Sequence, residues 1–295
     1  MWVNCGAARH LDNGAMLNIC LPCVSLGITQ VHRGRRVALR ALAAAMLMPA
    51  LPSTALARMA LATAINRTAR FRAMSQRTAK LYGQLHLNVR PERAREALEQ
   101  TRRQVRADLD ELDRQAWPPE VARLLADVRR SAERLDGLTA QPAGKSGLQA
   151  VSAQADQMLT HANSATQALE HLAQAPTARL VNMAGRQRML SQRLAKNYGL
   201  VAAGLDSRPL RDQIAGDAEE FQRAMAQLAG APLSTPAIRT TLELGQGQWV
   251  FFDMAIKRQP NARGLEDVAT TSERLLEVMD SLTALYEVAL QDVLG

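Results

Sequence analysis

Residues 182–199 read NMAGRQRMLSQRLAKNYG, and residues 66–83 read NRTARFRAMSQRTAKLYG. Aligned at an offset of 116 positions, the two stretches share ten identities in eighteen residues. The identities are Asn66/Asn182, Arg70/Arg186, Arg72/Arg188, Ser75/Ser191, Gln76/Gln192, Arg77/Arg193, Ala79/Ala195, Lys80/Lys196, Tyr82/Tyr198 and Gly83/Gly199. Neither stretch contains an acidic residue. This match indicates an internal duplication.

The repetition extends beyond these two stretches. At an offset of 117 positions the matching pairs are Gly147/Gly264, Leu148/Leu265, Val151/Val268, Leu159/Leu276, Ser164/Ser281, Thr166/Thr283 and Glu170/Glu287. Pro176 lies between the two repeats. We therefore expect two whole units of roughly 115 residues, a size that suits a four-helix bundle with short connections.

Composition and periodicity both favour helices. Hydrophobic residues make up 47% of the chain but aromatic residues only 3%, so the core must be built from Ala, Leu, Val and Met, which suits closely packed helices. Apolar spacing between proline and glycine breaks predicts eight helices. Their ranges are 60–86, 91–115, 119–138, 148–174, 177–204, 209–229, 236–258 and 265–294. The predicted fold is all-α, with one four-helix bundle at residues 58–175 and a second at 176–295.

Residues 1–57 resemble an export leader. Arg33, Arg35, Arg36 and Arg40 form a basic segment, residues 41–51 are apolar, and Ala55-Leu56-Ala57 fits a cleavage site. We expect a signal peptide and a periplasmic protein. The alternative is an uncleaved inner-membrane anchor at residues 37–57, although this core is shorter than the ~20 apolar residues of a membrane span. The twin arginine Arg35-Arg36 lacks the large apolar residue expected of a Tat signal.

Residues 1–30 are neither periodic nor signal-like, and they hold all three cysteines. We expect translation to start later, near Val31. Cys20 and Cys23 have the spacing of a redox motif but lack a surrounding strand and helix. The expected mature chain contains no cysteine and hence no disulfide.

The charge pattern argues against nucleic acid as a partner. The formal charge is +8, but five basic residues and one acid precede Arg58, which leaves 31 basic and 27 acidic residues in the remainder. These charges interleave along the predicted helices, as on solvated faces. We find no phosphate loop, nucleophile elbow or paired catalytic carboxylates, so we expect neither an enzyme nor a cofactor.

The remaining unusual residues have ordinary explanations. His161 and His171 lie about 80° apart around one helix without a cysteine nearby, so we expect no metal site. We interpret the methionines Met189, Met225, Met254 and Met279 as core residues. We also expect core packing for Trp249, Phe251 and Phe252, with an interface patch as the alternative.

The repeated cations require compensation. Arg186 and Arg193 lie on nearly one helix face, whereas Arg188 points about 160° away from Arg186. One explanation is pairing with acids of a neighbouring helix, for example Asp217, Glu219 or Glu220. The other is an anion, because the forked donors of a guanidinium fit a planar oxyanion.

The second copy of the motif resembles the signature helix of the NarX-like, or PilJ-type, periplasmic sensor domain. The shared elements are Gly185, the pair Arg188-Met189, Ser191 and the pair Arg193-Leu194. This domain occurs in nitrate- and nitrite-sensing histidine kinases and in methyl-accepting chemotaxis transducers of type IV pili. The helix pattern extends the resemblance over residues 60–292.

In the nitrate sensors of this family, the first helices of two subunits hold one anion at a dimer interface. The resemblance implies that Arg188 contacts the anion beside the Gly185 backbone, with Arg72 as the counterpart in the first copy. The first copy departs from the pattern at Ala69 and Ala73, which replace Gly and Met. The candidate ligand-binding residues are Gly185, Arg186, Arg188, Ser191, Arg193, Arg70, Arg72, Ser75 and Arg77.

Two arrangements of the repeats are open. If residues 60–86 pack against 177–204 about a pseudo-twofold axis, as in a homodimer, Arg72 and Arg188 converge on one pocket. If the bundles stack end to end, the two motifs lie far apart. Only an Arg72–Arg188 separation within side-chain reach permits a site inside one chain.

These features together favour an exported helical sensor that recognises a small oxyanion such as nitrate or nitrite. A family receptor continues into a membrane span and a signalling region, whereas this sequence ends at Gly295. We therefore expect the signal to pass through a receptor or kinase partner. The alternative is a ligand-free envelope module that associates with type IV pili or chemotaxis receptors. A homodimer and an intrachain pseudo-dimer are both compatible with the sequence.

Overall fold

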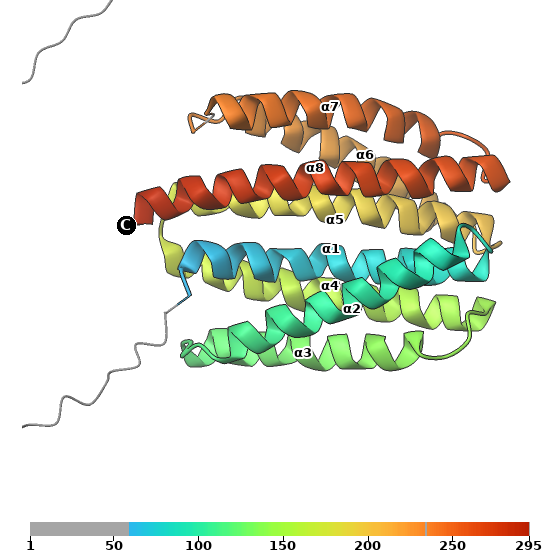
Figure 1. Ribbon diagram of the computed structural model, residues 1–295, viewed down its shortest axis with the longest axis horizontal. Helices are drawn as coiled ribbons and strands as arrows, with labels where there is room; N and C mark the ends of the chain where they lie inside the picture. Colours follow the sequence, from blue (N-terminus) through green and yellow to red (C-terminus); the bar gives the residue numbers. More distant parts are fainter. Residues whose placement is uncertain (1–58, 234, 295) are drawn as a thin grey trace, which may run out of the picture. The chain divides into compact units, whose positions relative to one another are not determined.

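The computed structural model describes residues 59–233 and 235–294, which form eight α-helices and no β-strand (Figure 1). The helices are α1 (Leu61–His86), α2 (Pro91–Asp113), α3 (Pro119–Thr139), α4 (Lys145–Ala173), α5 (Pro176–Ala202), α6 (Arg208–Ala229), α7 (Pro236–Ile256) and α8 (Ala262–Leu294). The all-α prediction is confirmed, and each helix end lies within three residues of its predicted position. The predicted leader at residues 1–57 and the three cysteines lie outside the described residues.

Prolines and local capping explain where the helices begin. Proline occupies one of the first positions of α2, α3, α5, α6 and α7, where its missing N–H leaves no hydrogen bond unmade. The Ser207 and Thr235 side chains accept hydrogen bonds from the backbone N–H groups of Leu210 and Ile238 and so cap α6 and α7. α5 ends before Gly204, whose φ of 72° suits a residue without a side chain.

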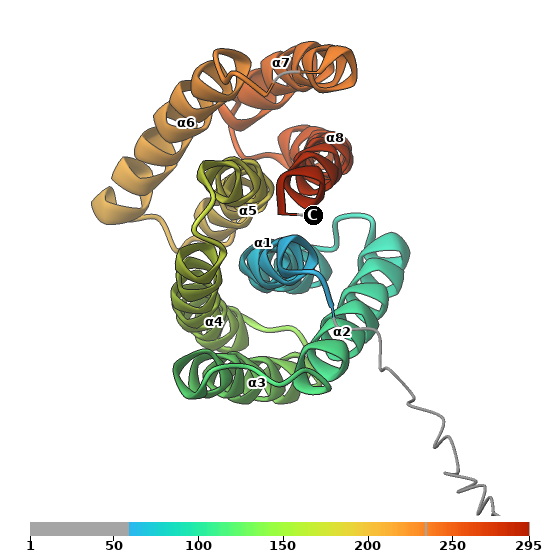
Figure 2. The same cartoon turned by 90° about the vertical axis from the view of Figure 1, so that its left-hand side faces the viewer.

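The two repeats lie side by side. Figure 2 looks along the helices and shows α1, α4, α5 and α8 at the centre, with α2 and α3 beside α1 and α4, and α6 and α7 beside α5 and α8. α1 packs along α5, which is its equivalent in the second repeat. End-to-end stacking is therefore excluded for these helices. All eight belong to one compact unit; a division into separate domains at residue 175 stays a prediction.

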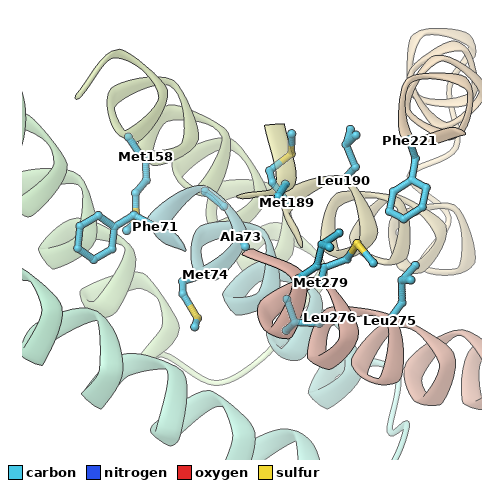
Figure 3. Close-up of a cluster of buried hydrophobic side chains, with 14 of the residues drawn as sticks. Phe71, Ala73, Met74, Met158, Met189, Leu190, Phe221, Leu275, Leu276 and Met279 are labelled. Atoms are coloured by element: carbon cyan, nitrogen blue, oxygen red, sulfur yellow. The ribbon is translucent and has the colours of Figure 1, made fainter. Parts of the chain in front are cut away.

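One apolar core runs through both repeats. Figure 3 shows Phe71 beside Met158 at the left, Met189 and Met279 in the middle, and Phe221 of α6 at the right. Trp249 stacks on Phe221 with ring centroids 4.2 Å apart, and Phe252 packs edge-on against Trp249. The core prediction is thus confirmed for Trp249, Phe252 and the methionines Met189, Met225 and Met279.

The core prediction is wrong for Phe251 and Met254. Their exposed fractions are 60% and 55%. Both lie on the outer face of α7, whereas Trp249 and Phe252 face α6 and the core, because neighbouring positions on a helix point in different directions. Among residues 59–233 and 235–294, none of the helices combines the length and the hydrophobicity of a membrane span.

Candidate functional site

Four cations of the repeated motif are buried between the helices. Arg72 and Arg188 are 1% and 0% exposed, and Lys80 and Lys196 are nearly as inaccessible. A buried charge is costly unless it is paired and hydrogen-bonded. What compensates each cation therefore decides what the motif does.

Carboxylates compensate both lysines, at equivalent positions in the two repeats. Lys80 pairs with Glu273 of α8, and Lys196 pairs with Asp156 of α4 at 2.6 Å. Asp156 and Glu273 are 117 positions apart, the offset that relates α4 to α8. Although burial alone would raise it, Lys80 and Arg77 lower the pKa of Glu273 to about 2. These two ion pairs are structural.

Four of the motif arginines are also paired with acids. Arg70 binds Asp108 at 3.1 Å and Arg186 binds Glu220. Arg77 donates to Glu273 at 2.5 Å, and Arg193 donates to Asp217 at 2.5 Å. The hydrogen bond that Arg186 donates to Glu220 raises the pKa of Arg186. Pairing with neighbouring acids thus explains these arginines.

Of the three acids proposed as partners of the motif, Asp217 and Glu220 fill that role. Glu219 does not. It lies on the exposed side of α6 and pairs with Arg223 one turn further along the same helix, at 3.6 Å.

The two remaining arginines reach from each repeat into the other. Arg72 Nη2 on α1 donates to the carbonyl of Asn182 on α5 at 3.1 Å. Arg188 Nη2 on α5 donates to the carbonyl of Asn66 on α1 at 3.2 Å, and to the Asn66 side chain at 2.8 Å. The Asn66 and Asn182 side chains in turn donate to Glu287 and Glu170. The contacts therefore repeat about a pseudo-twofold axis.

Gly185 lies where the two guanidinium groups converge. A Cβ placed on Gly185 would be 3.2 Å from Arg188 Nη2 and 3.4 Å from Arg72 Nη2. Both groups thus approach a single point, well within side-chain reach of each other. This is the geometry that a site inside one chain requires.

The partners of the two Nη1 groups break the symmetry. Arg188 Nη1 donates to the Asp280 carboxylate at 2.9 Å, whereas Arg72 Nη1 donates to the Asn163 amide oxygen at 3.1 Å. Asn163 and Asp280 are equivalent residues of α4 and α8, 117 positions apart. Arg188 therefore has an anionic partner at the place where Arg72 has a neutral one.

Arg72 is a buried cation whose hydrogen-bond acceptors are all neutral. They are the carbonyls of Ala69 and Asn182 and the side chain of Asn163. In residues 59–233 and 235–294, no carboxylate forms an ion pair with it. Burial lowers the pKa of Arg72 to about 9, and the charges of Arg186 and Arg188 add to this effect. The charge of Arg72 is thus the least compensated of the motif.

Arg72 lines an open pocket of about 510 Å³ between α4, α5 and α6. The pocket also contains Asn163, Glu170, Asn182 and Arg186. A second pocket of about 600 Å³ lies in the other half and overlaps the equivalent place through Asp280 and Arg70, but Arg188 does not line it. Of these two pockets, only the one at Arg72 has a buried guanidinium in its lining.

Ser75 and Ser191 face their own helices. Their hydroxyls donate to the carbonyls of Arg72 and Arg188 at 2.9 and 2.8 Å, three residues earlier in the same helix. These predicted site residues support the helices that carry the arginines.

His161 Nδ1 is hydrogen-bonded to the Ser131 hydroxyl at 2.7 Å. In the described part of the chain no cluster of three or more metal-ligating side chains occurs.

Sequence reasoning missed the neutral and acidic residues around the two arginines. Asn66 with Asn182 and Glu170 with Glu287 are identical pairs in the repeat alignment, so that signal was present. Asn163 and Asp280 are equivalent but not identical, so a search for identical residues in the two repeats does not find them. Only a comparison at the offset of 117 reveals this substitution.

Residues 173–262, which cover α5 to α7, match the family model described as "Type IV pili methyl-accepting chemotaxis transducer N-term". No curated protein and no solved structure matches the chain. The matched segment contains the second motif copy, with Gly185 and Arg188, and is less than half of the chain. Over these three helices the chain is therefore similar to the N-terminal domain of a chemotaxis transducer.

Proposed function

We propose that this protein is an exported helical sensor that binds a small oxyanion of the nitrate or nitrite class between its two repeats. The observation that carries the proposal is Arg72, a fully buried guanidinium without a carboxylate partner that lines an open pocket. Every other cation of the motif has an internal acid. A bound anion would supply the missing negative charge.

The chemistry of the site fits a planar oxyanion. A guanidinium presents its N–H donors in a rigid fork that meets two oxygens of one anion. Three neutral acceptors hold the Arg72 side chain in place, so little conformational entropy is lost when a ligand arrives. The low dielectric constant of a buried site strengthens the attraction between the two charges.

The proposed setting combines the leader with the family similarity. A signal peptide at residues 1–57 would deliver the helical unit to the periplasm; retained as an anchor, the same segment would hold it at the inner membrane. The similarity of α5 to α7 to a transducer domain supports a membrane receptor or kinase as the partner that receives the signal. That the first repeat belongs to the same family is part of this proposal.

Isothermal titration calorimetry with nitrate and nitrite tests the proposal, with chloride as the comparison anion. We expect a saturable heat for wild type that is lost in Arg72→Gln. Arg95→Ala is the matched control, because it removes one positive charge from the exposed surface of α2. If wild type shows neither heat nor a thermal shift at millimolar concentrations of either oxyanion, the oxyanion proposal is wrong.

A ligand-free interaction module is the second candidate, and the outer face of α7 favours it. Leu244, Val250, Phe251 and Met254 are each more than half exposed on this helix. The equivalent positions of α3, at the offset of 117, are Asp127, Glu133, Arg134 and Gly137. The equivalent face of α3 carries three charged residues and a glycine, so the bundle does not need an apolar face there. The apolar face of α7 would then bind a partner protein.

A further inference from the structure

We propose that Asp280 acts as a built-in anion for the second repeat, so that only the Arg72 half accepts an anion from solution. The residue at position 163 of α4, or 280 of α8, then decides which arginine is open to a ligand. This inference rests on the proposed function and specifies which half performs it. It also reverses the expectation from sequence, in which Arg188 was the direct contact and Arg72 its helper.

The equivalent contacts of Arg72 and Arg188 support the idea that the Asp280 side chain takes the place of a bound anion. Nη2 of each arginine is held by the opposite repeat through the carbonyl of Asn66 or Asn182. The Nη1 groups therefore occupy corresponding places. At one of them stands the Asp280 carboxylate, 2.9 Å away, and at the other the Asn163 amide, 3.1 Å away. The amide accepts a hydrogen bond but supplies no negative charge.

The exposure of the side chains also distinguishes the Arg188 half from the Arg72 half. The Asp280 side chain is 41% exposed while the Arg188 side chain is 1% exposed, so the carboxylate covers the guanidinium on the side of its pocket. Asp280 lines that pocket and Arg188 does not. In the other half both Asn163 and Arg72 line the pocket. An anion entering there reaches Arg72 without displacing a carboxylate.

The acids near the Arg72 pocket do not fill this role. Glu170 accepts a hydrogen bond from Asn182, and Glu220 is paired with Arg186. Both raise the pKa of Arg72, but burial and the repulsion of Arg186 and Arg188 lower it by more. The nearby carboxylates therefore do not fully compensate the positive charge of Arg72, and this uncompensated charge favours binding of an anion.

Reciprocal substitutions test the inference in the full-length protein. Asn163→Asp places a carboxylate of nearly the same shape beside Arg72, and we expect affinity for nitrate and nitrite to fall more than about ten-fold, the size of one lost charged contact. The same change should raise the melting temperature at low ionic strength without ligand. The double variant N163D/D280N should regain binding, which should then be lost with Arg188→Gln.

Gln167→Glu is the matched control, since it adds the same charge to the same pocket one turn further along α4. The inference is overturned if this control weakens binding as much as Asn163→Asp. It is also overturned if Asn163→Asp leaves both affinity and melting temperature unchanged, or if binding in the double variant still requires Arg72. A wild type without oxyanion binding refutes the proposed function as well. Binding with an unexpected variant pattern refutes only the division of roles between the halves.

Discussion

The Cβ atom of Ala69 lies 3.0 Å from the point that a Cβ on Gly185 would occupy. Positions 69 and 185 are equivalent in the repeat, and they face each other where α1 packs on α5. Methyl groups at both positions would lie closer than ordinary van der Waals contact unless the helices shifted by a few tenths of an ångström. In the sequence, the alanine of the first copy is a departure from the family pattern. In the folded chain, the glycine of one copy makes room for the alanine of the other.

Gly185→Ala should destabilise the protein. Alanine in a helix is ordinarily favoured over glycine by about 0.5–1 kcal/mol, but here the new methyl must push apart α1 and α5, and overpacking costs about 1–3 kcal/mol. We expect the free energy of unfolding to fall by about 1 kcal/mol in urea titrations. Gly216→Ala on α6, where the new Cβ would meet nothing within 4 Å beyond its chain neighbours and the backbone of its own helix, should raise it instead.

The double variant A69G/G185A completes this test. It moves the single methyl group to the other side of the same contact, so it should recover most of the stability lost in Gly185→Ala. Equal stabilisation by Gly185→Ala and Gly216→Ala would show that the α1–α5 contact has room to spare.

Local signals were enough to predict the helices. Pro91, Pro119 and Pro236 mark helix starts, and the repeat offset predicted that α1 and α5 would be equivalent. The partners of the cations could not be predicted in the same way. Helical periodicity says which residues share a face, but not which helix of the bundle that face meets. Pairing of Lys80 with Glu273 depends on α8 crossing to the first repeat, which no local pattern records.

The ion pair between Lys80 and Glu273 should make stability depend on pH in the acid range. The folded-state pKa of Glu273 is about 2, below its ordinary value of 4.5. Its stabilising contribution is therefore complete above about pH 4.5 and is lost as the pH falls toward 2. We expect Glu273→Gln to cost about 2 kcal/mol at pH 7, because Lys80 is left buried without its partner.

Urea unfolding at pH 7 and at pH 3 measures this effect. The difference in unfolding free energy between wild type and Glu273→Gln should shrink at the lower pH. Glu92→Gln, at an exposed side chain on α2, should match wild type at both values. An equal difference at the two pH values would mean that Glu273 acts through packing and not through its charge.

Two phenylalanines on neighbouring helices should respond very differently to truncation. Phe221 is fully buried and stacks on Trp249, so Phe221→Ala should cost about 3–5 kcal/mol of stability. Phe251 is 60% exposed, and Phe251→Ala should change stability by less than about 0.5 kcal/mol. Thermal unfolding of the two variants beside wild type makes the comparison. A large loss for Phe251→Ala would mean that a second surface covers it in solution.

The two repeats should unfold together. Arg72 is held by Asn182 and Arg188 by Asn66, so opening either repeat would leave buried polar groups of the other without partners, at about 1–3 kcal/mol each. Trp117 lies in the first repeat and Trp249 in the second. In each variant that keeps only one of these tryptophans, with Trp2 also replaced, the fluorescence midpoint in urea should equal the midpoint that circular dichroism gives for the same variant, the mark of a single cooperative transition. Distinct midpoints would instead establish residues 58–175 and 176–295 as separate domains. The arginines would then bridge two units that fold independently, and an anion would be expected to stabilise the interface more than either half.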